Sequence, residues 1–143
     1  MQERLYIDAN VVIDFIEKSD RHLMILFAEA EARAVGLVTS ELTLAEVIVQ
    51  PLQRSEAWRV HVFEELLADR KLIEMLPIDR TILRRSAELR ASIGGTTPDS
   101  IHVATALAAE CDAIVSSDRR LKMPKPLHRL SPADLPQRPG APS

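Results

Sequence analysis

The stretch Arg4-Leu5-Tyr6-Ile7-Asp8-Ala9-Asn10 decides the fold of this 143-residue chain. It begins with a short apolar run of strand-forming residues that stops at an aspartate. Residues 9–17 then place apolar side chains at helical spacing. We therefore expect a first strand that passes directly into a helix at Asp8.

The same alternation of strand and helix continues along the chain. Further strands are predicted at 37–39, 72–76, 113–116 and 127–130, and further helices at 20–36, 40–50, 53–69, 79–94 and 97–111. Strands that alternate with helices form parallel sheets covered on both faces. The sequence thus predicts an α/β fold, a three-layer α/β/α sandwich with a mainly parallel sheet of four to five strands.

Local signals set the expected ends of the helices. The residues expected to cap helix starts are Asp20, Ser40, Asp79 and Thr97. Gly36 is expected to end the helix after Asp20, and Pro51 to stop the helix after Ser40. The helix at 53–69 is expected to turn Trp58, Val62 and Leu66 inward.

Composition indicates an ordinary globular domain. Hydrophobic residues make up 46% and charged residues 27%, and the formal net charge is −3. A negative net charge weakens the case for binding nucleic acid by charge alone. The single cysteine, Cys111, excludes an internal disulfide and a cysteine-based zinc site. No apolar run approaches the roughly 20 residues that span a bilayer and no signal peptide is visible, so we expect a cytoplasmic protein without membrane contact.

The chain divides into a domain and a tail. Residues 1–131 carry the alternating pattern and are predicted to form one domain of ordinary size. Residues 132–143 are rich in proline and are predicted to be a disordered tail.

Four acidic residues stand at positions that favour a shared site. Asp8 follows the first strand and Asp118 follows the strand at 113–116, so both project toward the same edge of the sheet. Asp99 lies in the first turn of an otherwise apolar helix. Glu46 lies beside the inward stripe of its helix, where an ionised carboxylate is costly unless something compensates it.

Each acid also has a purely structural interpretation. Asp8 can cap the helix after it, Asp99 can favour the positive end of its helix, Asp118 can be a turn residue and Glu46 can lean into solvent. As a set, four converging carboxylates need a divalent cation or shared protons. Oxygen ligands select Mg²⁺ or Mn²⁺ over zinc, and such a site suits hydrolysis of a phosphodiester.

Four segments of the sequence resemble the motifs of PIN-domain nucleases. They are Tyr6-Ile7-Asp8-Ala9-Asn10, Leu44-Ala45-Glu46-Val47, the run from Thr97-Pro98-Asp99 to Ala104-Thr105-Ala106, and Val115-Ser116-Ser117-Asp118. The resemblance covers about residues 4–130. Their order and the size of the chain are similar to those of the VapC toxins of bacterial and archaeal toxin–antitoxin pairs.

The resemblance implies a function and roles for the residues. Asp8, Glu46, Asp99 and Asp118 would form the catalytic metal site for Mg²⁺ or Mn²⁺, and Asn10 would hold the first acid and its loop. Ser116 stands where the family usually has threonine and would orient the last acid or a phosphate. The implied activity is metal-dependent endonucleolytic cleavage of RNA.

The resemblance also implies partners. They are a VapB-like antitoxin that holds the toxin inactive and a second copy in a homodimer. We further expect a partner's helix to cover an apolar groove between residues 11–16 and 58–66.

Other interpretations of the same residues stay open. A phosphatase of the haloacid-dehalogenase type would use Asp8 as nucleophile but needs a second acid where Asn10 stands. A receiver-like signalling module would need an acid pair after the first strand and a late lysine. His102 shares a helix face with Asp99, and we expect it to be packed or hydrogen-bonded rather than a metal ligand.

Overall fold

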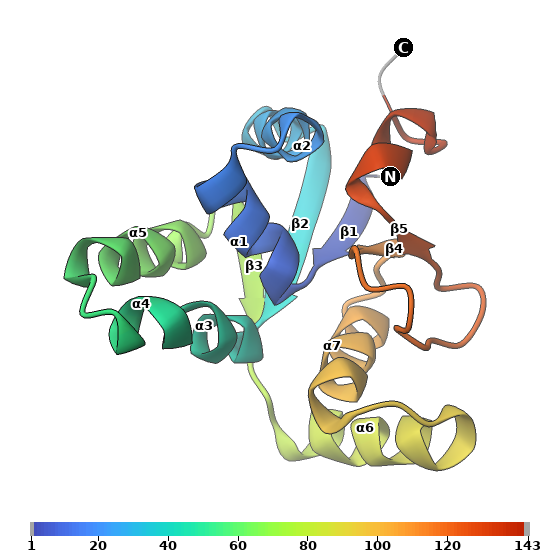
Figure 1. Ribbon diagram of the computed structural model, residues 1–143. Coiled ribbons are helices and arrows are strands. Elements are labelled where there is room, and N and C mark those ends of the chain that lie inside the picture. The colour runs from blue at the N-terminus through green and yellow to red at the C-terminus, as the bar shows by residue number, and fades with distance from the viewer. Residues whose placement is uncertain (1, 142–143) are drawn as a thin grey trace.

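The computed structural model describes residues 2–141 and places a parallel sheet at the centre of the molecule (Figure 1). Within these residues the sheet has five strands in the order β3-β2-β1-β4-β5, and every neighbouring pair is parallel. The strands are β1 (Glu3–Ile7), β2 (Val35–Ser40), β3 (Ile73–Leu76), β4 (Ala113–Val115) and β5 (Arg129–Leu130). The predicted parallel sheet is confirmed.

Helices cover both faces of this sheet. They are α1 (Ala9–Lys18), α2 (Arg21–Glu31), α3 (Glu41–Val47), α4 (Val49–Gln53), α5 (Ala57–Ala68), α6 (Arg80–Ile93), α7 (Thr97–Ala108) and the 3₁₀ helix η1 (Pro132–Gln137). Side chains alternate along β1, so Leu5 and Ile7 join the core under α1 and α2, while Tyr6 joins the core under α6 and α7. The result is the three-layer α/β/α sandwich expected from the sequence.

Most helix starts follow local capping chemistry. The side chains of Asp8, Asp20, Ser40 and Asp79 each accept a hydrogen bond from a backbone N–H in the first turn of the next helix. Thr96, one residue before the predicted cap, does the same for α7, and Pro98 is then the second helical residue. Gly94, with a φ of 80°, ends α6 as its sequence suggests.

Three further local predictions are wrong. The helix after Asp20 ends at Glu31 and not at Gly36, because Arg33 adopts a φ of 62° and the chain enters β2 at Val35. The helix after Ser40 ends at Val47, and Pro51 lies within a new short helix, α4. Proline fits there because the N–H groups of a first turn have no intrahelical acceptor.

The third error concerns Trp58, whose exposed fraction is 65%. Helix α5 buries Phe63 and Leu67 instead. At 100° per residue Trp58 lies about 140° around the helix from Phe63, on the outer side. Val11 and Val12 are buried in the protein's own core, whereas Ile13, Phe15 and Ile16 are half-buried, so part of the first wall of the predicted groove is closed by the protein itself.

The proline-rich segment that begins at residue 132 is folded as far as the structure describes it. Leu135 is buried in the core under α2, and the Arg138 side chain pairs with Glu3 and Glu29. Burial and paired charges offset the entropy that would favour a disordered tail over residues 132–141. The predicted tail's last two residues, 142 and 143, lie outside the described residues.

In the described residues, no helix has the length and apolar character that crossing a membrane requires.

Candidate functional site

Asp8 is held where β1 passes into α1. Its extended backbone makes it the N-cap of α1, and its Oδ1 accepts the N–H of Val11 at 3.0 Å. The interpretation of Asp8 as the cap of the following helix is therefore correct. The same half-buried side chain also lines a cleft at the carboxyl end of the sheet, so the cap does not exclude a role in a site.

The cleft brings the four predicted acids together. It has a volume of about 140 Å³ and is lined by Asp8, Glu46, Asp99 and Asp118, with Asn10, His102 and Ser116 among the remaining lining residues. The acids come from the end of β1, from α3, from the first turn of α7 and from the loop after β4. Parallel strands bring their carboxyl ends to one edge, which is why residues 110 positions apart share one cleft.

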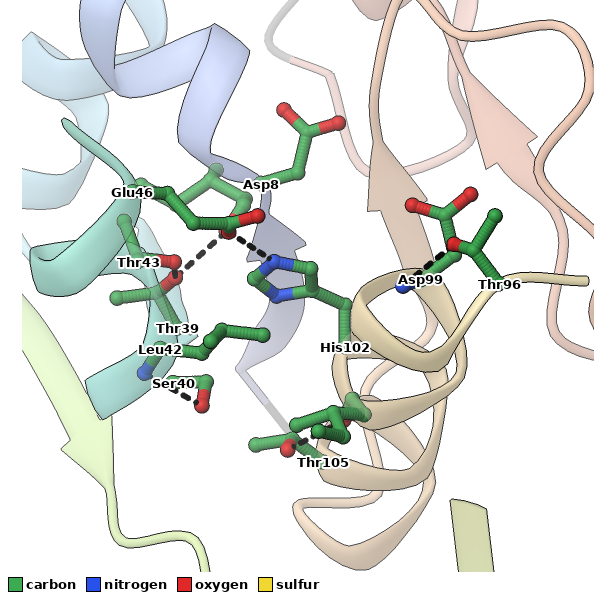
Figure 2. Close-up of polar contacts among 12 residues, drawn as sticks. Asp8, Thr39, Ser40, Leu42, Thr43, Glu46, Thr96, Asp99, His102 and Thr105 are labelled. Carbon is green, nitrogen blue, oxygen red and sulfur yellow. Dashed lines mark hydrogen bonds and ion pairs between the residues drawn. The ribbon is translucent and has the colours of Figure 1, made fainter. Parts of the chain in front are cut away.

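One wall of the cleft is fixed by hydrogen bonds. His102 reaches from α7 toward Glu46 on α3, where Nε2 lies 2.6 Å from Oε1 (Figure 2). On its other side, Nδ1 of His102 lies 2.5 Å from the hydroxyl of Tyr6. His102 is thus a hydrogen-bonded histidine, as expected. The contact of Tyr6 was not foreseen, although the alternation of side chains in β1 directs Tyr6 toward α7.

The opposite wall is more open. Asp118 accepts hydrogen bonds at Oδ1 from the N–H of Arg120 at 2.9 Å and from its Nε at 3.3 Å. These bonds, the backbone one first, hold the pKa of Asp118 below its usual range. The Ser116 hydroxyl accepts the backbone N–H of Asp118 at 3.0 Å, so it orders the loop that carries this acid.

Asp99 and Asn10 have fewer contacts. The backbone N–H of Asp99 donates to the Thr96 hydroxyl at 3.3 Å, which places Asp99 in the first turn of α7. Asn10 is exposed at the rim of the cleft. Within residues 2–141 no hydrogen bond joins the side chain of Asn10 to Asp8, so its predicted holding role has no direct contact behind it.

Burial raises the pKa of Asp8. The Ser116 hydroxyl, the Val11 N–H and nearby His102 oppose this effect, whereas the carboxylate of Glu46 adds to it. Asp8 therefore holds a proton more readily than an ordinary aspartate. A cation in the cleft would favour the ionised form of Asp8 instead.

By donor type, these residues suit a hard divalent cation, since four carboxylates line one small cleft. As the side chains lie, no three His, Cys, Asp or Glu groups among residues 2–141 are placed to hold one ion together. His102 holds one oxygen of Glu46, and Arg120 holds one oxygen of Asp118. The second oxygen of each carboxylate has no such bond within residues 2–141, and a shared ion would require at least one of the four carboxylates to turn toward the others.

Comparison with known protein families identifies one that matches most of the chain. The sequence model of the PIN domain matches residues 5–125. No curated protein matches the chain in sequence.

Solved structures share the fold. A toxin–antitoxin complex from Klebsiella pneumoniae has a chain with 21% identity and a TM-score of 0.69, with 90% of this chain and 97% of that chain covered. VapBC2 from Rickettsia felis, bound to a DNA fragment from its promoter, has 13% identity and a TM-score of 0.72, with 90% and 98% covered. FitAcB from Neisseria gonorrhoeae has 17% identity and a TM-score of 0.71, with 92% and 99% covered. On the family match over residues 5–125, this chain belongs to the PIN domain family.

Proposed function

We propose that this protein is a metal-dependent endoribonuclease, the toxin of a VapBC-type toxin–antitoxin pair. The observation that carries the proposal is the cleft in which Asp8, Glu46, Asp99 and Asp118 meet at the carboxyl edge of a PIN-domain sheet. Four acids in about 140 Å³ favour a bound cation, because like charges that close repel one another otherwise.

Each acid has a role in this proposal. Asp8 and Asp99 would be the main ligands of Mg²⁺ or Mn²⁺, with Glu46 and Asp118 completing the site directly or through water. The bound ion supplies an activated water and neutralises charge on the phosphate. Asp8 is suited to be a fixed metal ligand, because the Val11 N–H already orients its carboxylate through Oδ1. Ser116 keeps Asp118 at the cleft by holding its backbone.

The substrate would enter from the open wall. Arg119 and Arg120 are exposed beside Asp118, and Lys122 follows in the same loop. Cations at this position would attract RNA phosphates to a cleft that is otherwise acidic. The preference for RNA over DNA rests on the family resemblance, since hydrolysis by activated water does not require the 2′-hydroxyl.

Partners are proposed from the structural neighbours. The structures from Klebsiella and Rickettsia are toxin–antitoxin complexes by description or by name, which supports a VapB-like antitoxin as partner. A homodimer in the cytoplasm is the proposed working form of the toxin. The phosphatase and signalling alternatives gain nothing from the structure, because Asn10 stands at the cleft where the phosphatase needs an acid.

The proposal is tested by incubating the purified chain with single-stranded RNA. We expect cleavage with Mg²⁺ or Mn²⁺ and none in excess EDTA. An Asp99→Asn preparation, purified in parallel, measures contaminating nuclease. Cleavage that persists in EDTA, or that is equal in the variant, would contradict the proposal.

A further inference from the structure

A chain of hydrogen bonds lies behind the cleft and links three separate elements. His102 on α7 is 4% exposed, and its two ring nitrogens contact Glu46 on α3 at 2.6 Å and Tyr6 on β1 at 2.5 Å. Tyr6 is completely buried and stands two residues before Asp8. The chain thus connects the strand that positions the first acid with the helix that carries the second.

The partners give each ring nitrogen a defined role. An ionised carboxylate only accepts hydrogen bonds, so Nε2 of His102 carries the hydrogen and donates it to Glu46. In the neutral ring Nδ1 is then an acceptor, and the Tyr6 hydroxyl donates to it. The imidazole is therefore held at both ends in one orientation.

This arrangement restricts Glu46 in particular. Oε1 is held by His102, and no other hydrogen bond to this carboxylate is found within residues 2–141. The side chain of Glu46 is 33% exposed, whereas that of His102 is 6% exposed. A flexible glutamate at the cleft is thus fixed by a rigid ring that cannot itself move without breaking a buried contact.

The contacts of His102 differ from those of the next buried polar side chain on the same helix face. Thr105, one turn further along α7, is also completely buried, and its hydroxyl donates to the carbonyl of Ile101 in its own helix. His102 instead contacts side chains 56 and 96 residues away in the sequence, one of which lines the cleft. These two partners connect the ring to β1 and to the cleft, which a bond within its own helix would not do.

We propose that His102 is a positioning residue, fixed by Tyr6, that aims the carboxylate of Glu46 into the metal-binding cleft. The inference rests on the proposed function, since it assigns a purpose to the orientation of Glu46. It adds two residues to the machinery of the site that touch neither substrate nor metal.

The test measures Mn²⁺ affinity by isothermal titration calorimetry on the full chain. His102→Asn keeps an amide near the position of Nδ1 but cannot reach Glu46, and we expect it to weaken binding about 10–100-fold. His102→Gln places an amide N–H near the position of Nε2 and should recover most of that affinity. Tyr6→Phe leaves the ring without its second anchor, and we expect a smaller loss of a few-fold. Thr105→Val is the control, a buried change on the same helix that leaves Glu46 alone.

A double-mutant cycle separates positioning from loosening of the fold. In a Glu46→Gln background, His102→Asn should have no further effect on Mn²⁺ affinity, because the carboxylate that it positions is gone. Equal losses in both backgrounds, or an equal loss for Thr105→Val, would overturn the inference. So would a His102→Gln variant as weak as His102→Asn while both melt at the same temperature.

The outcomes also distinguish the two proposals. A wild-type chain that does not bind Mn²⁺ would contradict the proposed function and this inference together. A wild-type chain that binds Mn²⁺ and is weakened by Glu46→Gln but not by His102→Asn would overturn only the positioning role.

Discussion

Acidic side chains lie at both ends of the sheet, and the two groups differ in the positive charges that they contact. At the amino end, Glu3 of β1 and Glu29 of α2 both pair with Arg138, whose Nε and Nη2 lie 3.0 and 2.5 Å from their carboxylate oxygens. The Arg138 side chain is 2% exposed and comes from the segment after η1, beside the start of β1 (Figure 1). At the carboxyl end lies the cleft with its four acids.

The difference lies in where the compensating charge comes from. The amino-end pair has a buried guanidinium, which also donates to the Leu135 carbonyl at 2.8 Å. In the cleft, the basic groups bonded to the acids within residues 2–141 are His102 and the exposed Arg120. Acids that hold the fold together receive a cation from the chain itself. Acids that face the cleft have no buried guanidinium among their bonded partners within residues 2–141, and the proposed function assigns their compensation to a bound metal ion.

The largest expected effect comes from removing the internal cation. Arg138→Leu would leave Glu3 and Glu29 facing each other without a partner, and breaking a buried pair in this way costs about 3–5 kcal/mol. We expect the free energy of unfolding, measured by urea denaturation, to fall by that amount. The Mn²⁺ affinity of the folded variant should stay unchanged, because the cleft lies at the other end of the sheet. A decrease in the free energy of unfolding of less than about 1 kcal/mol would mean that Glu3 and Glu29 do not depend on Arg138 for stability.

Asp99→Asn addresses the acids of the cleft. We expect kcat/KM for RNA cleavage to fall by about 10²–10³-fold, since each tenfold corresponds to about 1.4 kcal/mol and a metal ion supplies several. Stability should change little, because no hydrogen bond to the Asp99 carboxylate is found in the described part of the chain. A melting temperature that falls as far as for Arg138→Leu would show that Asp99 serves the fold.

Asp8→Asn is expected to raise stability when metal is absent. Burial raises the pKa of Asp8, so the folded chain holds this proton more tightly than the unfolded chain does. Ionised Asp8 therefore destabilises the metal-free fold, and its loss should raise the melting temperature in EDTA. Asparagine also caps helices well, so the start of α1 is kept. Wild type should gain about 3–6 °C with Mg²⁺ at ten times Kd, and the variant much less.

The pH dependence of the higher melting temperature expected for Asp8→Asn tests whether the ionised carboxylate of Asp8 is its cause. Below about pH 4 Asp8 is protonated in both the folded and unfolded chain, so wild type bears no penalty there. As pH rises from that value through the raised pKa, wild-type stability is lost and the advantage of Asp8→Asn should grow. Thermal melts in EDTA across pH 4–8 measure it. A variant that melts lower at every pH would make Asp8 a structural cap alone.

The smallest expected effect concerns Arg120. Its side chain is 92% exposed, so Arg120→Ala should change stability by less than about 1 kcal/mol. The backbone N–H of residue 120 is kept, and it is the main cause that lowers the pKa of Asp118. We expect the pKa of Asp118, followed by NMR of the carboxyl carbon, to rise but to stay below its usual range. A full return to that range would assign the effect to the guanidinium.

Local chemistry made much of the fold predictable. A short polar side chain before an apolar periodic run identified the caps Asp20, Ser40 and Asp79, each of which depends on bonds within three residues. The strand that ends at Asp8 and the alternation after it identified the parallel sheet. The topology of that sheet then predicted that Asp8 and Asp118 meet at one edge, as they do.

Contacts between distant residues were not predictable in this way. The pairing of Arg138 with Glu3 joins residues 135 positions apart, and it helps to hold a segment whose prolines indicate disorder. The contact between His102 and Glu46 spans 56 positions. Pro51 differs from its prediction for another reason, because a proline that can end one helix is also compatible with the first turn of the next.

The exposed position of Trp58 determines what an optical experiment on this protein can follow. It is the single tryptophan of the sequence, its exposed fraction is 65%, and its ring lies 5.6 Å from the Arg59 guanidinium rather than within the core. The indole is hydrated in the folded chain as it is in the unfolded one, so its emission should change little on denaturation. A shift of that emission to shorter wavelength would instead report that another molecule has covered the outer side of α5.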